Sequence, residues 1–556
     1  MCGILLTTRG IENLPSIIEF LKYRGPDETN HVSIRGLNFV HTLLSMTGPP
    51  TLQPFSNQDN SIITFFNGEI YNYGDFGNFS SDGECILPLY EKYGKDFVKE
   101  LDGEFALALV DFNADLLIFS TDVFSIKPLW FAKEGSDWGL SSYESCLIRN
   151  GYSKPMQVEA NSTYLYKLST MEIIDRFDVH KFDLNQYKTN YDDWNIAFSN
   201  AIKKRTNNIK HGIFIGLSSG YDSGAIACEL EKQNIPFTAY SIIGSENKET
   251  IDERIIRTSD PRLFDLKRED FMSARDNLKK RCEEYFLSID NGEIDILNTE
   301  IEKLNSVSKI LEKLEPIYRG LNDPEVTNQV RLNRNEKALL EKRIPKLSDL
   351  VKYRKFGQVL TDDNGAIGMS HICRLGKSEG QLIYLSGSGA DEIFSDYGFE
   401  GIKHFRHSTI GGLFPEDLES IFPWKNFFDN TQRAYLMKEE YVSGSYGVEG
   451  RYPFLDTKVV QEFLWLSADL KNSNYKSVLY NYLNINKYPF DNSTKVGFNC
   501  GFSPVNDGFI DQKSKFRKVG TTQDQSLIVD FVLEASKTKN RKNRYTILKN
   551  ETTPVQ

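Results

Sequence analysis

Residues 212–224 read GIFIGLSSGYDSG, an almost wholly apolar run that passes into small and polar residues. Such a run predicts a buried strand of a parallel sheet, and helix-like residues flank it at 194–204 and 225–232. Ligands of such sheets bind outside the carboxyl ends of the strands. Small residues let backbone N–H groups approach a phosphate, and the N-terminus of the following helix favours its charge. The stretch therefore predicts an α/β domain with a phosphate-binding loop.

The second half of the chain contains a further loop of this kind at residues 384–392, which read YLSGSGADE. Neither loop contains Gly-Lys-Ser or Gly-Lys-Thr, so a Walker-type NTPase is disfavoured. Between them, residues 268–355 are highly charged and predict helices, for which we favour a hairpin laid on the domain over a coiled coil. Residues 537–549 are basic and polar, and they predict a solvated tail.

The first 180 residues have a different pattern, in which short apolar runs alternate with turn residues, as at 61–66, 105–110 and 115–119. These runs predict strands, while residues 14–22 and 86–93 predict helices. We expect sheets sandwiched by helices in this region.

Cys2 follows the initiator methionine directly. Removal of Met1 would leave a nucleophilic thiol beside its own α-amine, which titrates at roughly 7.7 to 8.0 and can take the thiol proton without a histidine. Position 2 thus suits a self-contained catalytic cysteine.

Composition narrows the class of protein. The 556 residues carry a net charge of −11, and this acidic balance gives no electrostatic footprint for nucleic acid. No stretch reaches the ~20 apolar residues of a membrane helix. The seven cysteines are scattered without a CxxC pair, which indicates neither a disulfide framework nor a zinc site. We expect a cytoplasmic protein with small-molecule substrates and with no nucleic-acid or membrane partner; a homodimer is left open.

Five segments in order resemble the class II glutamine amidotransferase domain, which has the N-terminal-nucleophile fold: residues 2–4, 24–27, 66–72, 81–84 and 122–129. The resemblance implies a domain over residues 2–185. It implies Cys2 as the nucleophile, with the side chain of Asn67 and the backbone N–H of Gly68 as oxyanion donors. The glutamine-binding residues that it implies are Arg24, Asn67, Glu69 and Asp82, the last of these on the α-ammonium.

One segment departs from that pattern. The family has His-x-Arg-Leu where this chain has His41-Thr42-Leu43-Leu44, and Leu43 cannot clamp the glutamine α-carboxylate. Either another cation substitutes or glutamine binds weakly. His41 itself is interpreted as a packed strand residue.

The loop at 217–224 resembles the SGGxDS pyrophosphate loop of ATP pyrophosphatases, with Ser219 in place of the first Gly. Together with residues 384–392, 447–456 and 494–498, it resembles the synthetase domain of glutamine-hydrolysing asparagine synthetases, here over residues 190–530. The resemblance implies Mg²⁺ binding by Asp222 and Asp391, and charge stabilisation on the departing pyrophosphate by Lys495. It implies ATP binding by Leu217, Ser218, Ser219, Gly220, Asp222, Ser223, Ser386 and Gly387. The 447–456 element is interpreted as architectural.

Ser388 is a second departure, since asparagine synthetases carry at this position a Glu that takes part in amide formation. Diverged asparagine synthetase domain-containing proteins also lack that Glu and have an altered His-x-Arg segment, and this chain shares features with them.

Together these features predict an N-terminal-nucleophile αββα sandwich followed by an α/β parallel-sheet ATP-pyrophosphatase domain with a helical insertion. The predicted function is glutamine-dependent amidation of a carboxylate with ATP and Mg²⁺, with aspartate as the default acceptor through an acyl-adenylate. The alternatives are a different carboxylate acceptor, or a regulatory homologue in which the substitutions at Leu43, Ser219 and Ser388 have ended synthesis.

Overall fold

The computed structural model describes residues 2–153, 155–244, 246–282, 286–287, 302, 358–360, 363–405, 407–491, 502–505 and 508–511. Lys495, the tail at 537–549 and most of the predicted helical insertion lie outside the described residues.

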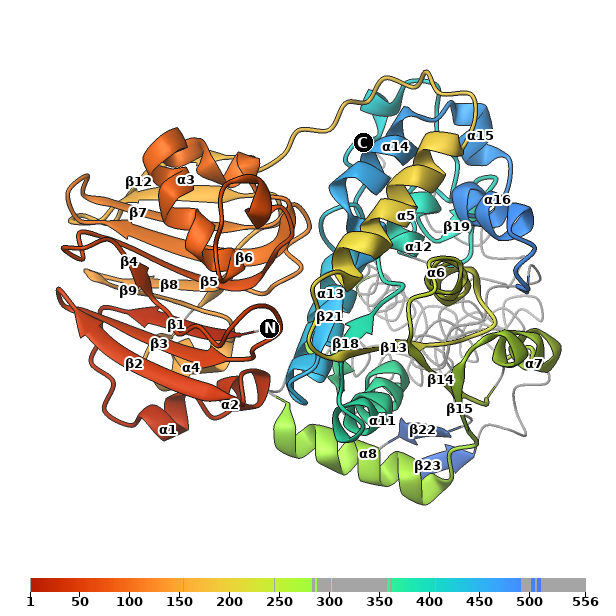
Figure 1. Cartoon of the computed structure of the whole chain (residues 1–556), viewed down its shortest axis with the longest axis horizontal. Coiled ribbons are helices and arrows are strands. Elements are labelled where there is room, and N and C mark those ends of the chain that lie inside the picture. The colour runs from red at the N-terminus through yellow and green to blue at the C-terminus, as the bar shows by residue number, and fades with distance from the viewer. Residues whose placement is uncertain are drawn as a thin grey trace, which may run out of the picture.

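The N-terminal unit is built from two antiparallel sheets (Figure 1). The first sheet has the strand order β10 (Met156–Gln157), β8 (Trp130–Glu134), β9 (Asp137–Ser141), β1 (Gly3–Thr7), β3 (Leu37–Leu43) and β2 (Glu28–Ile34). The second has the order β12 (Glu172–Phe177), β11 (Thr163–Lys167), β7 (Leu116–Thr121), β6 (Gly103–Asp111), β5 (Ile62–Ile70) and β4 (Phe55–Ser56).

Successive side chains along a strand of this unit pack in different layers, one between the two sheets and one between a sheet and its helices. Ile4 and Leu6 of β1 pack between the two sheets with Phe65 of β5, while Leu5 packs on the outer side with Leu21. Successive strand residues point to opposite faces, so β1 serves both layers. Helices α1 (Leu14–Ile17), α2 (Leu21–Arg24) and α4 (Glu144–Arg149) lie on the first sheet, and α3 (Ile86–Tyr93) contacts β5 of the second. The expected αββα sandwich is confirmed.

The C-terminal unit contains a five-stranded sheet in the order β15 (Asp260–Phe264), β14 (Thr238–Ile242), β13 (Gly212–Gly216), β18 (Gln381–Leu385) and β21 (Glu449–Arg451). All its strand pairs are parallel, as the apolar run at 212–217 predicts. Its helices are α5 (Asp192–Thr206), α6 (Tyr221–Lys232), α7 (Lys248–Arg257), α8 (Arg268–Arg281), α11 (Asn364–Ser378), α12 (Ala390–Phe394), α13 (Thr431–Gly444), α14 (Thr457–Trp465), α15 (Ala468–Asn472) and α16 (Ser477–Ile485).

Short elements complete the described chain. Four further two-residue strands are β16 (Phe286–Leu287), β17 (Gln358–Val359), β19 (Gly398–Phe399) and β20 (Ile402–Lys403), and a hairpin pairs β22 (Phe502–Val505) with β23 (Gly508–Asp511). The 3₁₀ turns are η1 (Tyr73–Asp75), η2 (Asp82–Cys85), η3 (Gly94–Glu100), η5 (Leu418–Ser420) and η6 (Pro453–Leu455).

Buried ion pairs join the two units where α13 and β21 face the N-terminal sandwich (Figure 1). The carboxylate of Glu440, on α13, accepts from Nη2 of Arg24 at 2.7 Å and from Nζ of Lys127 at 3.0 Å. The side chains of Arg24 and Glu440 are fully buried. Arg205 of α5 pairs with Glu104 of β6, so the network continues along the contact. Buried ion pairs between side chains of the two units therefore help to hold the units together.

We predict that Glu440→Ala lowers the free energy of unfolding by about 3–5 kcal/mol, because it leaves Arg24 and Lys127 buried without their carboxylate. Urea unfolding of the purified protein measures the change. Glu419→Ala, at an exposed position, is the matched control. Equal unfolding midpoints for the two variants would contradict the prediction.

Candidate functional site

Cys2 lies immediately before β1 and is held by Asn67 of β5. The backbone N–H of Cys2 donates to Oδ1 of Asn67 at 2.8 Å, which fixes the orientation of the amide. Asn67 is fully buried, and its Nδ2 has no hydrogen-bond partner in the described part of the chain. An unpaired buried donor is costly unless a ligand uses it. The arrangement suits donation to a negative oxygen formed next to Cys2.

Gly68 follows Asn67 in a conformation that glycine favours. Its φ is +145°, and a Cβ there would lie 2.0 Å from the carbonyl oxygen of Glu104. Phe105, the partner of Gly68 in the β5–β6 register, uses both its backbone N–H and its carbonyl on Asp122. In an antiparallel ladder this leaves the N–H of Gly68 outside the β5–β6 bonds. It is thus available as a second donor.

Two buried carboxylates, Glu69 and Asp82, lie in the same region. Burial is the main cause that raises the pKa of Asp82 to about 6, and it raises the pKa of Glu69 to about 8, with the charge of Glu449 adding to both shifts. Asp82 also accepts from the backbone N–H of Ile70 at 2.9 Å. A buried group of carboxylates can bind an ammonium group.

The sequence analysis missed two residues at this site, Glu449 and Arg451 of β21. Nη2 of Arg451 lies 3.2 Å from Oε1 of Glu69 and 2.7 Å from Oε1 of Glu449. The charge of Glu449 also raises the pKa of Cys2, after the larger effect of burial. The strand element that was interpreted as architectural therefore also places two charged side chains beside the N-terminal site.

Arg24 lies behind the nucleophile. Its Nε donates to the carbonyl oxygen of Cys2 at 2.9 Å, and its two Nη atoms donate to Glu440 and Tyr143. The side chain is fully buried, so this geometry positions the backbone of Cys2.

Leu43 and His41 are buried in β3, and Nδ1 of His41 accepts from the backbone N–H of Gln53 at 3.2 Å. The interpretation of His41 as a packed strand residue agrees with this position. Nζ of Lys210 lies 3.3 Å from Oγ of Ser45, two residues after Leu43 in the sequence. Lys210 is therefore the cation that we test as a replacement for the missing clamp.

The second candidate site lies at the carboxyl ends of β13 and β18. In the first loop, Oγ of Ser218 and Oγ of Ser223 are 2.8 Å apart, and the N–H of Gly220 donates to Oγ of Ser218 at 3.2 Å. Leu217 is held by a bond from its N–H to the carbonyl of Tyr240. The loop is thus preformed at the start of α6.

Two further charged residues bind this loop. Arg254 of α7 donates to the carbonyls of Ser218 and Gly220, and a Cβ at Gly224 would lie 2.2 Å from its guanidinium. Glu246 accepts from both N–H and Oγ of Ser219, each at 2.6 Å. The carboxylate of Glu246 therefore already occupies two donors of the loop that could bind an anion. The serine at 219 supplies one donor that the family's glycine lacks.

Asp222 and Asp391 come together around one cation. Nζ of Lys476, which lies just before α16, is 2.6 Å from Oδ1 of Asp222 and 2.8 Å from Oδ1 of Asp391. Lys476 is 2% exposed. Tyr475 adds a bond from its hydroxyl to Asp391 at 3.0 Å. Lys476 was missed because no sequence pattern links it to an acid 254 residues away.

The second loop packs against the first. A Cβ at Gly387 would lie 2.8 Å from Cβ of Asp222, so only a residue without a side chain permits this approach. The N–H of Ser386 donates to the carbonyl of Arg451 at 3.0 Å. The predicted ATP-binding residues of both loops thus form one site, whereas Lys495 lies outside the described residues.

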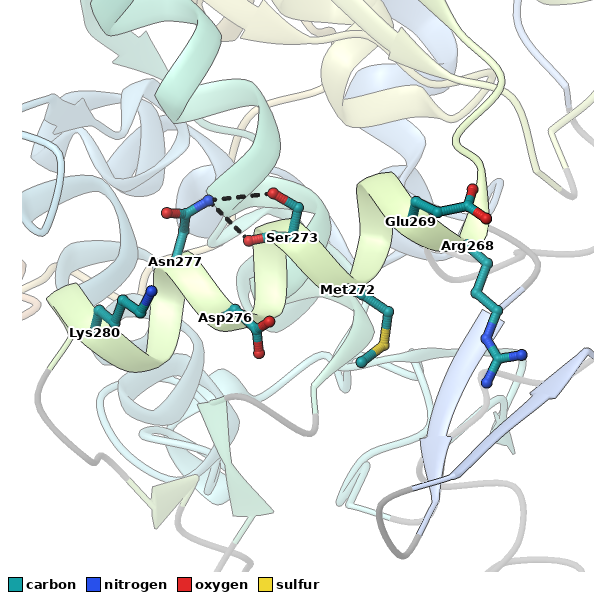
Figure 2. A pocket seen from close by; sticks show the side chains of 7 residues that line it. All are labelled: Arg268, Glu269, Met272, Ser273, Asp276, Asn277 and Lys280. Carbon is teal, nitrogen blue, oxygen red and sulfur yellow. Dashed lines mark hydrogen bonds between the residues drawn. The ribbon is translucent and has the colours of Figure 1, made fainter.

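A hollow of about 620 Å³ lies along α8 and is lined by none of the residues of the two sites (Figure 2). Its described lining consists of Arg268, Glu269, Met272, Ser273, Asp276, Asn277 and Lys280.

No group of three or more His, Cys, Asp or Glu side chains among the described residues is placed to hold a metal ion. None of the helices within the described ranges is long and apolar enough to cross a membrane.

Known proteins resemble this chain in its N-terminal unit and, at lower identity, over most of its length. Residues 1–188 match the glutamine amidotransferase domain. Over 84% of its length, the chain is 24% identical to a Methanocaldococcus jannaschii protein whose name assigns it as glutamine-hydrolyzing asparagine synthetase 1, covering 76% of that protein. It is 23% identical to asparagine synthetase (glutamine-hydrolyzing) 1 of Saccharomyces cerevisiae, over 83% of this chain and 75% of that one. It is 34% identical to asparagine synthetase (glutamine-hydrolyzing) 2 of Oryza sativa subsp. japonica, over 25% of this chain and 26% of that one. The N-terminal unit is a class II glutamine amidotransferase domain, and the chain is a distant homologue of asparagine synthetases over most of its length.

We predict that kcat/KM for glutamine falls as the pH drops below about 6, because protonated Asp82 no longer attracts the α-ammonium group. Burial raises the pKa of this carboxyl, so the loss begins at a higher pH than for an exposed aspartate. Initial rates of glutamine hydrolysis across the pH range test this. Asp82→Asn should lower kcat/KM and remove the acid limb, whereas Asp75→Asn, an exposed change, should keep it. An acid limb that persists in Asp82→Asn would show that another group causes it.

Proposed function

We propose that this chain is a glutamine-dependent ligase that uses ATP to convert a carboxylate to an amide, with aspartate as the acceptor and asparagine as the product. The observation that carries the proposal is the pair Asp222 and Asp391, which the ends of two neighbouring parallel strands bring to one cation in the same chain as a glutamine amidotransferase domain. The relatives named above support it, since they are named for that reaction.

In the N-terminal site, Cys2 is the proposed nucleophile. Burial raises the pKa of its thiol, so the thiol needs a base, and the α-amine exposed by removal of Met1 is adjacent to it. Asn67 Nδ2 and the N–H of Gly68 then stabilise the oxyanion that forms on the glutamine amide. Asp82 holds the substrate's α-ammonium.

In the second site, ATP with Mg²⁺ supplies the activation of the acceptor carboxylate. The loop from Leu217 to Ser223, with Ser386 and Gly387, is proposed to bind the nucleotide. Asp222 and Asp391 fit Mg²⁺, because they offer only oxygen ligands and already hold a cation, the ammonium of Lys476. Lys476 is placed to balance negative charge on the phosphates, beside the role implied for Lys495.

A cytoplasmic location fits the seven scattered cysteines, which contain no CxxC pair. Glutamine, ATP and aspartate are the proposed small-molecule partners, and the charge balance gives no reason to add nucleic acid or a membrane.

Exchange of labelled pyrophosphate into ATP tests the function. Exchange that depends on aspartate, together with asparagine formation from glutamine, is the expected result. A different carboxylate that drives exchange would replace aspartate as the acceptor, and no exchange with any carboxylate would overturn the proposal.

We predict that Cys2→Ala abolishes glutamine hydrolysis while ATP-dependent amide formation from ammonium chloride survives, because the two sites lie in separate units. Product formation is measured with each nitrogen source. Equal loss with glutamine and with ammonium chloride would contradict the prediction.

We further predict that Leu43→Arg lowers KM for glutamine more than it raises kcat, because a clamp on the α-carboxylate is remote from the reacting amide. Lys210→Ala tests the alternative: a raised KM in this variant, with an unchanged KM in Leu43→Arg, would identify Lys210 as the cation. Steady-state kinetics of both variants measure this. An unchanged KM in Leu43→Arg would mean that another cation already binds the carboxylate.

A further inference from the structure

The loop after β18 is bound by an acidic side chain from another element. Oγ of Ser388 donates to Oε1 of Glu439 at 2.7 Å, and Oγ of Ser386 donates to Oε2. Glu439 lies on α13, 51 residues from Ser388. Both of its carboxylate oxygens are therefore directed into the loop.

This carboxylate lies where the two loops of the second site meet. Gly387, between the two serines, directly approaches Asp222, and Asp391 follows in α12. Glu439 is intermediate in exposure as a residue, and its carboxylate faces the serines of the loop. It is thus near the cation-binding acids without taking part in their pairing with Lys476.

Another acid of the same region points elsewhere. Glu392, one residue after Asp391, accepts from the hydroxyl of Tyr397 and is 3% exposed. Its backbone carbonyl accepts from Nε1 of Trp424, which packs it against the core. Glu439 therefore fits better than Glu392 as an acid–base group that meets a substrate.

We propose that Glu439 is the general base of the amide-forming step and replaces, from α13, the loop carboxylate that Ser388 lacks. This inference rests on the function proposed above. Ammonia forms the new C–N bond at the activated carbonyl, and the C–O bond to the phosphate breaks with its electron pair leaving on the phosphate oxygen. The proton lost by the nitrogen passes to Glu439 and then to solvent.

Two properties of Glu439 suit this role. Burial raises the pKa of its carboxyl, which brings its basicity closer to the working pH. The two serine hydroxyls donate to the ionised form and hold it in one orientation. Ser388 is accordingly a positioning residue.

Glu439→Gln tests the proposal with aspartate as the probe and ammonium chloride as the nitrogen source. Amide formation should fall by about 10²-fold or more, while aspartate-dependent pyrophosphate exchange falls much less. Glu392→Gln is the matched comparison. Retained amide formation in Glu439→Gln, or a selective loss in Glu392→Gln instead, overturns the inference.

A positional swap separates chemistry from folding. Ser388→Glu alone should impair the enzyme, because it places a second carboxylate against Glu439. Combining Ser388→Glu with Glu439→Ser should restore amide formation relative to Glu439→Ser alone, since one carboxylate again occupies the site. Failure of the swap to exceed the single variant, in protein that still catalyses pyrophosphate exchange, counts against the inference.

A readout without turnover completes the test. In ¹³C NMR of glutamate-labelled protein, the resonance missing from Glu439→Gln should titrate above the usual range of glutamate, and an ordinary midpoint counts against a base tuned by burial. If the unaltered protein shows no exchange with any carboxylate, the proposed function fails, and this inference fails with it. Exchange and amide formation that both survive in Glu439→Gln overturn the inference alone.

Discussion

The buried carboxylate of Glu440 is the interaction on which the relation between the two units depends. A charge without solvent is costly unless it is paired, and both cations that pair with Glu440, Arg24 and Lys127, belong to the other unit. Arg24 also donates to the carbonyl of Cys2, so the position of the nucleophile depends on the same docking. The docking of the two units and the position of Cys2 therefore depend on the same buried ion pair, between Arg24 and Glu440.

Helix α13, which carries Glu440, also contacts the second site. Successive residues of a helix point about 100° apart, so the neighbours Glu439 and Glu440 face different partners. Glu440 meets the sandwich, while Glu439 meets Ser386 and Ser388. Strand β21 also contacts both units. It forms one edge of the parallel sheet, and its Arg451 pairs with Glu69 of the N-terminal unit. Two elements of one unit thus contact both sites.

Much of this arrangement could be predicted from the sequence, because local patterns carry it. The apolar run at 212–217 predicts β13, its small-residue loop predicts the site beside it, and the similar run before Asp391 predicts the neighbouring strand end. Lys476, Arg254 and Glu439 could not be predicted in this way. Each is a lone charged residue whose partners lie far along the chain, so only the folded packing identifies it.

In the loop after β13, the carboxylate of Glu246 competes with any incoming anion for the two donors of Ser219. Because Glu246 belongs to the same chain, its local concentration is high and constant, and any incoming anion has to displace it before using those two donors. The displacement cost is the same for every ligand, so it removes a larger share of the affinity of a small anion than of a polyphosphate with many other contacts. Under the proposed function, Glu246 therefore makes the loop favour large, multiply bound phosphates over free phosphate.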